Sequence, residues 1–169
     1  ISFEVRSTFS NKTGTTVKKK VKSLEDTLVS GVAMDKNQVR LSIKELPDRP
    51  GAAAAIFKVM SESGVVVDMI VQNVARNGKA NLTFTVPSED AFRAEKALNE
   101  HFQGQVGGKL GSSTNIVKIS VVGVGMRSHS GVASKFFEAL ANAGSNMLMI
   151  STSEIKISVG VSPENSDDA

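Results

Sequence analysis

The sequence predicts an α+β protein built from two tandem copies of one β-α-β-β-α-β unit, the split-βαβ plan of ferredoxin-like domains. Two observations support this fold class. The chain repeats itself at a constant offset, and each repeat shows the same succession of strand and helix patterns. The composition agrees, since 40% hydrophobic and 22% charged residues are typical of a globular protein. The second copy is expected to be truncated.

The repeat has an offset of 80 residues, which carries Gly51 onto Gly131 and Gly64 onto Gly144. Apolar residues match in the same register, and no gap is needed over the whole unit. The further pairs are Val39 with Ile119, Leu41 with Val121, Ala53 with Ala133, Phe57 with Phe137, Met60 with Leu140 and Ile70 with Ile150. Glycines alone match by chance, but glycines and apolar positions in one register indicate a duplication.

The first half of the first copy predicts a strand followed by a helix. Residues 39–43 alternate between apolar and polar side chains, as a half-buried strand does. The helix is expected from Gly51 to about Ser63, and Gly64 is expected to end it. Its inward face follows the helical spacing and comprises Ala53, Ile56, Phe57 and Met60.

The second half of the first copy predicts two strands, a helix and a last strand. Residues 65–74 are mostly apolar and β-branched, which favours a largely buried strand, and residues 76–78 (Arg-Asn-Gly) indicate a hairpin before an alternating strand at 81–86. A helix capped by Ser88 is expected to reach Phe102, and a strand is expected near residue 109. The helix residues available for burial are Ala91, Ala94, Leu98 and Phe102.

The second copy predicts the same order. Strands are expected at 116–124, 146–152 and 155–161, and a helix is expected at 131–143 with Ala133, Phe136, Phe137 and Leu140 inward. Ser162, Pro163 and Glu164 have the pattern of a helix start. This second helix is the part expected to be truncated. Residues 28–34 form one more strand candidate, whose sheet the pattern does not assign.

The composition excludes several kinds of site. The chain has no Cys, so disulfides, thiolate metal sites and thiol catalysis are excluded, and two His make a metal site unexpected. The net charge is only +3, and the basic run at 18–22 is expected to be a solvated linker rather than a nucleic-acid contact. No apolar run approaches the ~20 residues of a membrane span, and no secretory pattern is present. A cytoplasmic protein without membrane or nucleic-acid partners is expected.

The stretch Leu46–Phe57, "LPDRPGAAAAIF", joins the first strand to the first helix. Pro fixes one backbone angle and Gly frees the next, so the pair predicts a turn. Small residues after the turn leave backbone N–H groups accessible at the helix start, where an anion can bind. The alternative, a turn without a ligand, stays open on these residues alone.

Several stretches resemble the regulatory region of aspartate kinases (aspartokinases), a tandem pair of ACT domains. They are "LPDRPGAAAAIF", "VDMIVQNV", "VGVGMRSHSGVASKFFEAL" and "NMLMISTSEIKISV". The N-terminal "FEVRSTFSNKTGTTV" resembles the closing strand of the preceding amino-acid kinase domain. The resemblance implies the end of that domain and a linker at 1–27, a first ACT domain at 28–112 and a second, C-terminally incomplete one at 113–169.

The resemblance also implies a function. The region would mediate feedback inhibition by threonine, lysine or both, and would self-associate through its ACT domains beside a kinase catalytic domain or subunit. The parent enzyme would use ATP and Mg²⁺ to phosphorylate L-aspartate. Nothing in this chain resembles the nucleotide or aspartate site, so no catalytic residue, cofactor or metal is expected here.

The effector contacts that the resemblance implies fall in both copies. In the first copy they are Asp48, Arg49, Pro50, Gly51, Ala52, Ala53, Val66, Val67, Asp68 and Gln72. In the second they are Val132, Ala133, Asn146, Met147, Ser153 and Glu154. Backbone N–H groups at 51–53 would hold the effector carboxylate, Asp48 would accept a hydrogen bond or meet the ammonium group, and Gln72 would select a polar tail. Val66 stands where the family often has Asn, and Ser130 stands where Pro is usual.

Three other readings remain open at this point. The first is an ACT sensor of another metabolic enzyme, against which "ISTSEIKIS" and the N-terminal stretch argue. The second is an RNA-binding sheet, which would need aromatic residues that the strands at 67–74 and 146–153 lack. The third is a small ferredoxin-like enzyme, for which no catalytic pair can be placed.

Overall fold

A computed structural model of the chain describes residues 3–9, 13–17, 29–73, 77–102, 107–111, 113–123 and 131–165. Its strands are β1 (Phe3–Val5), β2 (Thr15–Val17), β3 (Gly31–Pro47), β4 (Ile70–Gln72), β5 (Lys79–Pro87), β6 (Lys109–Leu110), β7 (Thr114–Val122), β8 (Met147–Thr152) and β9 (Lys156–Val161). Its α-helices are α1 (Ala52–Glu62), α2 (Ala91–Phe102) and α3 (Val132–Asn142). Short 3₁₀ turns lie at Ser88–Asp90 and Pro163–Asn165.

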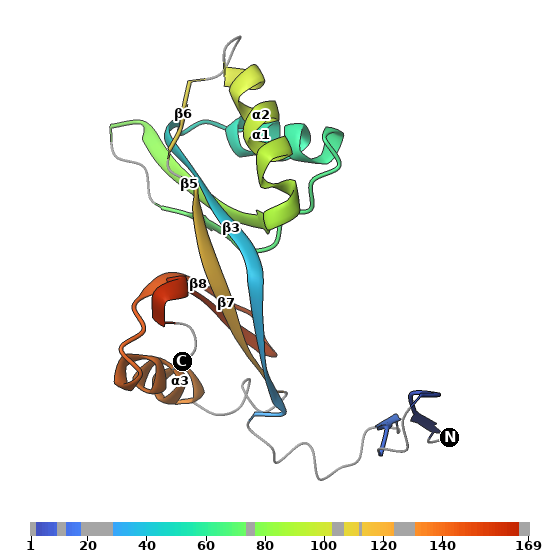
Figure 1. Cartoon of the computed structure of the whole chain (residues 1–169). Helices are drawn as coiled ribbons and strands as arrows, with labels where there is room; N and C mark the ends of the chain where they lie inside the picture. Colours follow the sequence, from blue (N-terminus) through green and yellow to red (C-terminus); the bar gives the residue numbers. More distant parts are fainter. Residues whose placement is uncertain are drawn as a thin grey trace.

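The predicted α+β fold with two ferredoxin-like units is confirmed. In the first unit the strand order is β4-β5-β3-β6 with antiparallel pairing throughout, and α1 and α2 belong to the same unit. In the second unit the order is β8-β9-β7-β3, again antiparallel, with α3 as its helix. The two units form one continuous sheet, with α1 and α2 at one end and α3 at the other (Figure 1). Strands β1 and β2 pair separately from this sheet.

The long strand β3 belongs to both units. Residues 31–35 pair with β7, residues 38–40 pair with both β7 and β5, and the strand from residue 41 to 47 pairs with β5. The expected short strand at 28–34 is therefore not separate, because from Gly31 onward it is continuous with the strand predicted at 39–43. A bulge between Asp35 and Gln38 explains why one strand has the sequence pattern of two. Its extra residue moves the apolar positions from even numbers before the bulge to odd numbers after it. The N-terminal part of β3 completes the sheet of the second unit.

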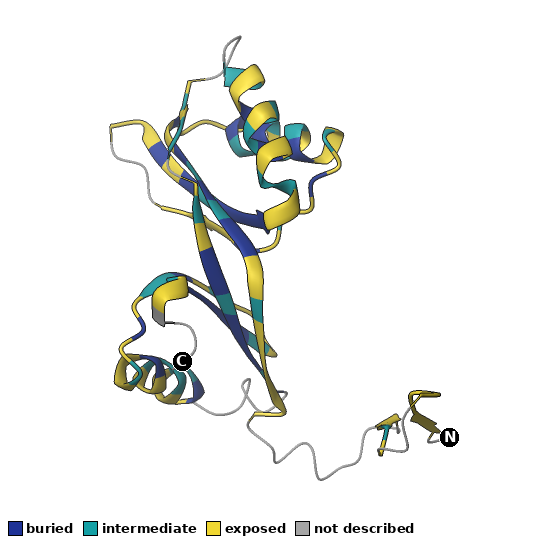
Figure 2. Cartoon of the chain, viewed as in Figure 1, coloured by how far each residue is buried: buried dark blue, intermediate teal, exposed yellow. Residues whose placement is uncertain are grey.

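Each unit has its own hydrophobic core (Figure 2). The largest fully buried side chains of the first core include Leu41, Ile56, Phe84 and Leu98, which come from β3, α1, β5 and α2. The core of the second unit comprises Val117, Ile119, Leu140, Val159 and Val161, with Phe136, Phe137 and Met147 partly buried against it. The sheet face away from the helices is also buried where the units meet, around Met69, Ile116 and Met149.

The predicted helix stop at Gly64 is confirmed, and Gly144 repeats it in the second unit. Gly64 and Gly144 adopt φ of +66° and +70° and follow Ser63 and Ala143, the C-cap residues of α1 and α3. In each case the next residue donates its N–H to the helix five positions earlier: Val65 to the Met60 carbonyl at 2.9 Å and Ser145 to the Leu140 carbonyl at 2.9 Å. This is the Schellman pattern, in which glycine relieves the strain of the left-handed residue.

The strand predicted at 65–74 is wrong in extent and burial. Only Ile70–Gln72 is a strand, and Val74 lies outside the described residues. All three residues of β4 are exposed, because β4 is the edge strand beside β5. Val65 and Met69 are buried, whereas Val66 is 69% exposed. An apolar run of this kind predicts burial on both faces, but the structure places β4 at the edge of the sheet.

The predicted cap at Ser88 is also wrong. Ser88 lies inside a 3₁₀ turn that begins after Pro87, and no side chain from the described ranges caps that turn. Helix α2 starts only at Ala91, although Ala94 and Leu98 are fully buried as expected. The 3₁₀ turn takes in Ser88, so its hydroxyl does not precede the first helical turn as a cap must. None of the described helices is long and apolar enough to cross a membrane.

Candidate functional site

The Asp-Arg-Pro-Gly stretch forms a tight turn between β3 and α1. The Ala52 N–H donates to the Arg49 carbonyl at 3.2 Å, so residues 49–52 form a β-turn with Pro50 and Gly51 in its middle. Gly51 has φ +90° and ψ −15°, close to the third position of a type II turn. A Cβ on Gly51 would meet no atom within 4 Å, so the conformation alone calls for glycine.

This turn leaves backbone donors free at the start of α1. Among the described residues, no acceptor takes a hydrogen bond from the N–H groups of Gly51, Ala53 or Ala54. The Ala52 N–H was predicted to be one of the free donors, but it closes the turn. No side chain of the described residues caps the helix, and its first turn has no acidic residue. The site can therefore accept an anion without displacing an internal partner.

The second unit reproduces this geometry at α3. Gly131 has φ +109° and ψ −8°, and no side chain in the described part of the chain caps the helix. The Lys135 N–H donates to the Gly131 carbonyl at 3.0 Å, as the Ala55 N–H does to Gly51 at 2.9 Å. Val132 and Ala133 form the first turn of α3. The repeat in the sequence is thus also a repeat of backbone conformation at the same position of each unit.

Gln72 lies at the same end of the first unit as the turn. The Asp48 N–H donates to the Gly78 carbonyl at 2.9 Å, which ties the turn to the start of β5. In β4, Gln72 is opposite Leu82, whose side chain is in the core beneath the helices. Because side chains opposite each other share a face, Gln72 points to the helix-covered face at the sheet edge. Gln72 is exposed there.

Val66, Val67 and Asp68 lie at the other end of the unit. They follow the C-terminus of α1, and the Asp68 N–H donates to the Thr85 carbonyl at 3.0 Å. A helix of 11 residues is about 16 Å long. The two groups of predicted contacts are therefore separated by the length of α1 within one unit. The structure does not bring them together in a single chain.

The second unit divides its predicted residues in the same way. Val132 and Ala133 begin α3, whereas Asn146 and Met147 follow its C-terminal end. Ser153 and Glu154 form the turn between β8 and β9, with the Ser153 N–H donating to the Lys156 carbonyl at 2.7 Å. The Ser153 Oγ also accepts from the Lys156 N–H at 3.1 Å. The hydroxyl of Ser153 is thus part of the turn itself.

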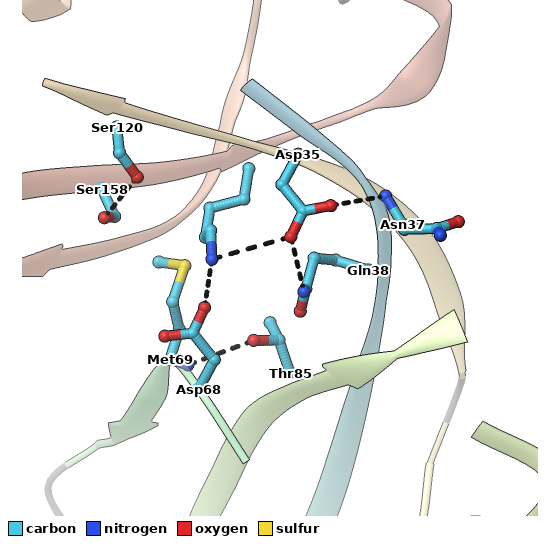
Figure 3. Close-up of polar contacts among 9 residues, drawn as sticks. Asp35, Asn37, Gln38, Asp68, Met69, Thr85, Ser120 and Ser158 are labelled. Atoms are coloured by element: carbon cyan, nitrogen blue, oxygen red, sulfur yellow. Dashed lines mark hydrogen bonds and ion pairs between the residues drawn. The ribbon is translucent and has the colours of Figure 1, made fainter. Parts of the chain in front are cut away.

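A charged cluster that the sequence analysis did not identify lies where the units meet (Figure 3). Lys118 on β7 donates from Nζ to Oδ2 of Asp68, and the same Nζ is 3.8 Å from Oδ2 of Asp35 on β3. The Lys118 side chain is only 17% exposed. The signal in the sequence was a single lysine in an otherwise largely apolar strand. Its partners Asp68 and Asp35 lie 50 and 83 residues earlier in the chain, so only the folded sheet brings them to the lysine.

Asp35 holds the bulge of β3 beside this cluster. Its Oδ1 accepts from the Asn37 N–H at 2.9 Å and its Oδ2 accepts from Gln38 Nε2 at 2.8 Å. The Asn37 N–H hydrogen bond lowers the pKa of the Asp35 carboxyl below its usual value; burial opposes this, and Gln38 and Lys118 reinforce it. Asp35 is therefore an acceptor for both the bulge and the lysine.

A cavity of about 220 Å³ lies elsewhere, between α3 and the β3–β7 pair. Its lining is Val29, Val32, Val121, Val132, Lys135 and Phe136. Almost all of this surface is apolar, so it does not match the carboxylate and ammonium groups of a free amino acid. Among the described residues, no three His, Asp or Glu side chains are grouped to hold a metal ion.

Comparison with known proteins identifies the two units. A family profile of the ACT domain matches residues 39–103, and a second ACT-domain profile matches residues 119–169. The aspartokinase of Helicobacter pylori (strain ATCC 700392 / 26695) is 45% identical over 163 residues, which is 94% of this chain and 40% of that protein. The chain thus spans about two fifths of the length of this curated relative.

Two solved structures have the same fold over most of the chain. The ligand-free regulatory subunit of aspartate kinase from Thermus thermophilus is 38% identical with a TM-score of 0.77, covering 83% of this chain and 92% of that one. A structure of aspartokinase alpha and beta subunits is 40% identical with a TM-score of 0.68, covering 80% of this chain and 89% of that one.

Proposed function

Because this chain belongs to the aspartokinase family, as a regulatory region of two ACT domains, we propose that it binds a free amino acid and signals its concentration to a kinase. The proposed effectors are L-threonine, L-lysine or both. Their binding would bias an attached catalytic domain or subunit toward an inhibited arrangement. Such coupling requires that the effector binds the two arrangements with different affinities.

The observation that supports this proposal is the helix start after the turn at 49–52. Free N–H groups of Gly51, Ala53 and Ala54 suit the carboxylate that all amino acids share. Asp48 beside them is exposed and can meet the ammonium group. Gln72, at the same end of the unit, offers an amide to a hydroxyl or amino group of the effector side chain.

The proposal includes a second ACT unit at each site. Within one unit the turn at 48–53 and the segment 66–68 are about one helix length apart, so a small amino acid cannot touch both. Two units packed side by side and antiparallel would place the turn of one beside the segment 66–68 of the other. The exposed Val66, Ile70 and Val71 give the first unit an apolar edge for such packing, with exposed fractions of 69%, 47% and 37%. We therefore propose self-association through the ACT domains.

The parent protein is proposed to be an ATP- and Mg²⁺-dependent kinase of L-aspartate. The catalytic partner would be a kinase domain of the same chain or a separate subunit. The comparison with aspartokinase alpha and beta subunits supports an assembly of this kind. The predicted cytoplasmic location belongs to this proposal.

Titration calorimetry of the chain with L-threonine and L-lysine, separately and together, tests the binding step. We expect saturable binding of at least one of them, weakened about tenfold or more in Gln72→Ala, because one hydrogen bond to a charged or polar group is lost. Asn99→Ala, on the exposed face of α2, is the matched control and should bind as the wild type does. A folded protein that binds neither amino acid would contradict the proposal.

A further inference from the structure

Lys118 connects the two units at a point where their backbones do not pair. It lies on β7, whose neighbours are β3 and β9, and it reaches the segment just before β4. Its acceptor there, Asp68, belongs to the segment 66–68 that is proposed to contact the effector. The second unit therefore has a direct polar contact with one half of the proposed site of the first unit.

Among the described residues, the backbone of the stretch that Lys118 reaches is hydrogen-bonded to β5 alone, while Met69 packs against Ile116 and Met149 of the second unit. The Asp68 N–H donates to the Thr85 carbonyl at 3.0 Å, and the Met69 N–H donates to Thr85 Oγ1 at 3.1 Å. The Thr85 N–H donates back to the Met69 carbonyl at 3.0 Å. These bonds link the backbone of Asp68 and Met69 to β5. They do not set the direction of the Asp68 side chain, which is the part that a hydrogen-bond donor of the effector would meet.

The environment of Lys118 makes its contact with Asp68 specific. The lysine side chain is 17% exposed, whereas those of Asp68 and Asp35 are 34% and 39% exposed. A largely enclosed ammonium group needs acceptors, and two carboxylates from different elements supply them. Only Oδ2 of Asp68 is used, so among the described residues its Oδ1 has no donor.

We propose that Lys118 is a positioning residue for the effector site: it orients the Asp68 carboxylate and links the segment 66–68 to the second unit. This inference rests on the proposed function for the identity of the ligand. An effector that meets Asp68 finds it already turned and held. Any displacement of 66–68 on binding either moves Lys118, and with it β7, or breaks the ion pair. β7 passes the displacement to both of its neighbours, β3 and β9.

The first test needs no ligand. In Lys118→Met, which keeps the length of the side chain but removes its charge, hydrogen exchange is followed at the amides of Asp68 and Met69. We expect their exchange to become about tenfold faster, as for the loss of one hydrogen bond to a charged group. Exchange at Val159, in the core of the second unit, should stay unchanged. Lys79→Met, which removes an exposed ion pair with Glu45 at 3.1 Å, is the matched control.

The second test uses L-lysine and L-threonine as probes in calorimetry. We expect Lys118→Met to weaken binding about tenfold and Lys118→Arg to restore most of it, because arginine also donates to a carboxylate. The double variant Lys118→Met with Asp68→Asn should bind no more weakly than Asp68→Asn alone, since the lysine acts through that carboxylate. Recovery of binding in Lys118→Arg and a non-additive loss in the double variant would distinguish a positioning role of Lys118 from a general loss of packing.

The outcomes distinguish this inference from the proposed function. Unchanged exchange at Asp68 and Met69 in Lys118→Met overturns the positioning role, whatever binds. Additive losses in the double variant overturn it as well. If the wild type binds neither probe but hydrogen exchange at Asp68 and Met69 changes as expected in Lys118→Met, the positioning role is supported and the proposed ligands are wrong.

Discussion

Gly51 and Gly131 show how single residues determine the candidate site. Both adopt positive φ, +90° and +109°, immediately before a helix, and neither has a neighbouring atom that a Cβ would strike. Their role is conformational, because a left-handed residue lets the chain turn sharply from strand to helix. The sequence predicted this from Pro50, Gly51 and the small residues that follow. It did not predict which N–H groups stay free, since that depends on the hydrogen bond from Ala52.

Gly51→Ala is expected to destabilise the chain by about 1–2 kcal/mol, because an L-residue with a Cβ is strained at this φ. It should also weaken amino-acid binding, since the strain is relieved by distorting the turn. The measurement is urea-induced unfolding with calorimetry of the folded variant. Gly31→Ala is the control, because Gly31 has open space and no positive φ. Equal stability of Gly51→Ala and the wild type would show that the turn tolerates a side chain.

Lys118 and Asp35 mark the limit of residue-level prediction. A lysine in a strand reads as a solvated side chain, and Asp35 reads as part of a polar break between strands. Their meeting with Asp68 depends on the register of β3 against β7, in which Asp35 lies opposite Lys118. Register is decided by all the pairs of a sheet together, so no local pattern contains it.

At the scale of elements, helix type and position were predicted better than strand burial. Helical periodicity reports which face is buried: the predicted faces of α1 and α2 contact the first core, and the predicted α3 residues that contact the second core are Phe136, Phe137 and Leu140. An apolar run in a strand does not report whether one face or two are covered. β4 is the example: its residues are apolar, yet it is the exposed edge of the first unit. That edge is the surface for which self-association is proposed.

Helix α2 offers a matched pair of substitutions that compares its buried face with its exposed face. Leu98→Ala is expected to cost about 2–5 kcal/mol of unfolding free energy, because Leu98 is fully buried in the first core. Phe92→Ala, on the opposite face, should change it by less than about 0.5 kcal/mol, because Phe92 is 79% exposed. Urea denaturation of both variants measures the difference. Similar losses in the two variants would mean that Phe92 is buried in solution by a partner or a second copy.

At the level of the whole molecule, β3 joins the two units into one continuous sheet. It pairs with β5 in one unit and with β7 in the other, so neither unit can lose β3 without affecting its neighbour. The contact of Met69 with Ile116 and Met149 adds buried surface on the other face of the sheet. This shared strand excludes two independent domains joined by a linker, an arrangement that a tandem repeat also allows.

The shared strand predicts a single cooperative unfolding transition. Leu140→Ala, in the core of the second unit, should lower the stability by about 2–5 kcal/mol, and it should do so for both units together. Hydrogen exchange followed by mass spectrometry at increasing urea can compare peptides from β5 and β9. Loss of protection in β9 at a urea concentration where β5 stays protected would contradict the prediction.

The sequence by itself determined the duplication, the element types, the glycine turns and the family, because each depends on residues close together or on a fixed offset along the chain. The tertiary structure alone decided that one strand serves both units, that β4 is an exposed edge, that the two halves of the predicted site lie about a helix length apart, and that Lys118 meets Asp68 and Asp35. These features depend on strand register and on which surfaces meet. Both are set by the packing of the whole chain, because residues far apart in sequence must pair before either partner has its final place.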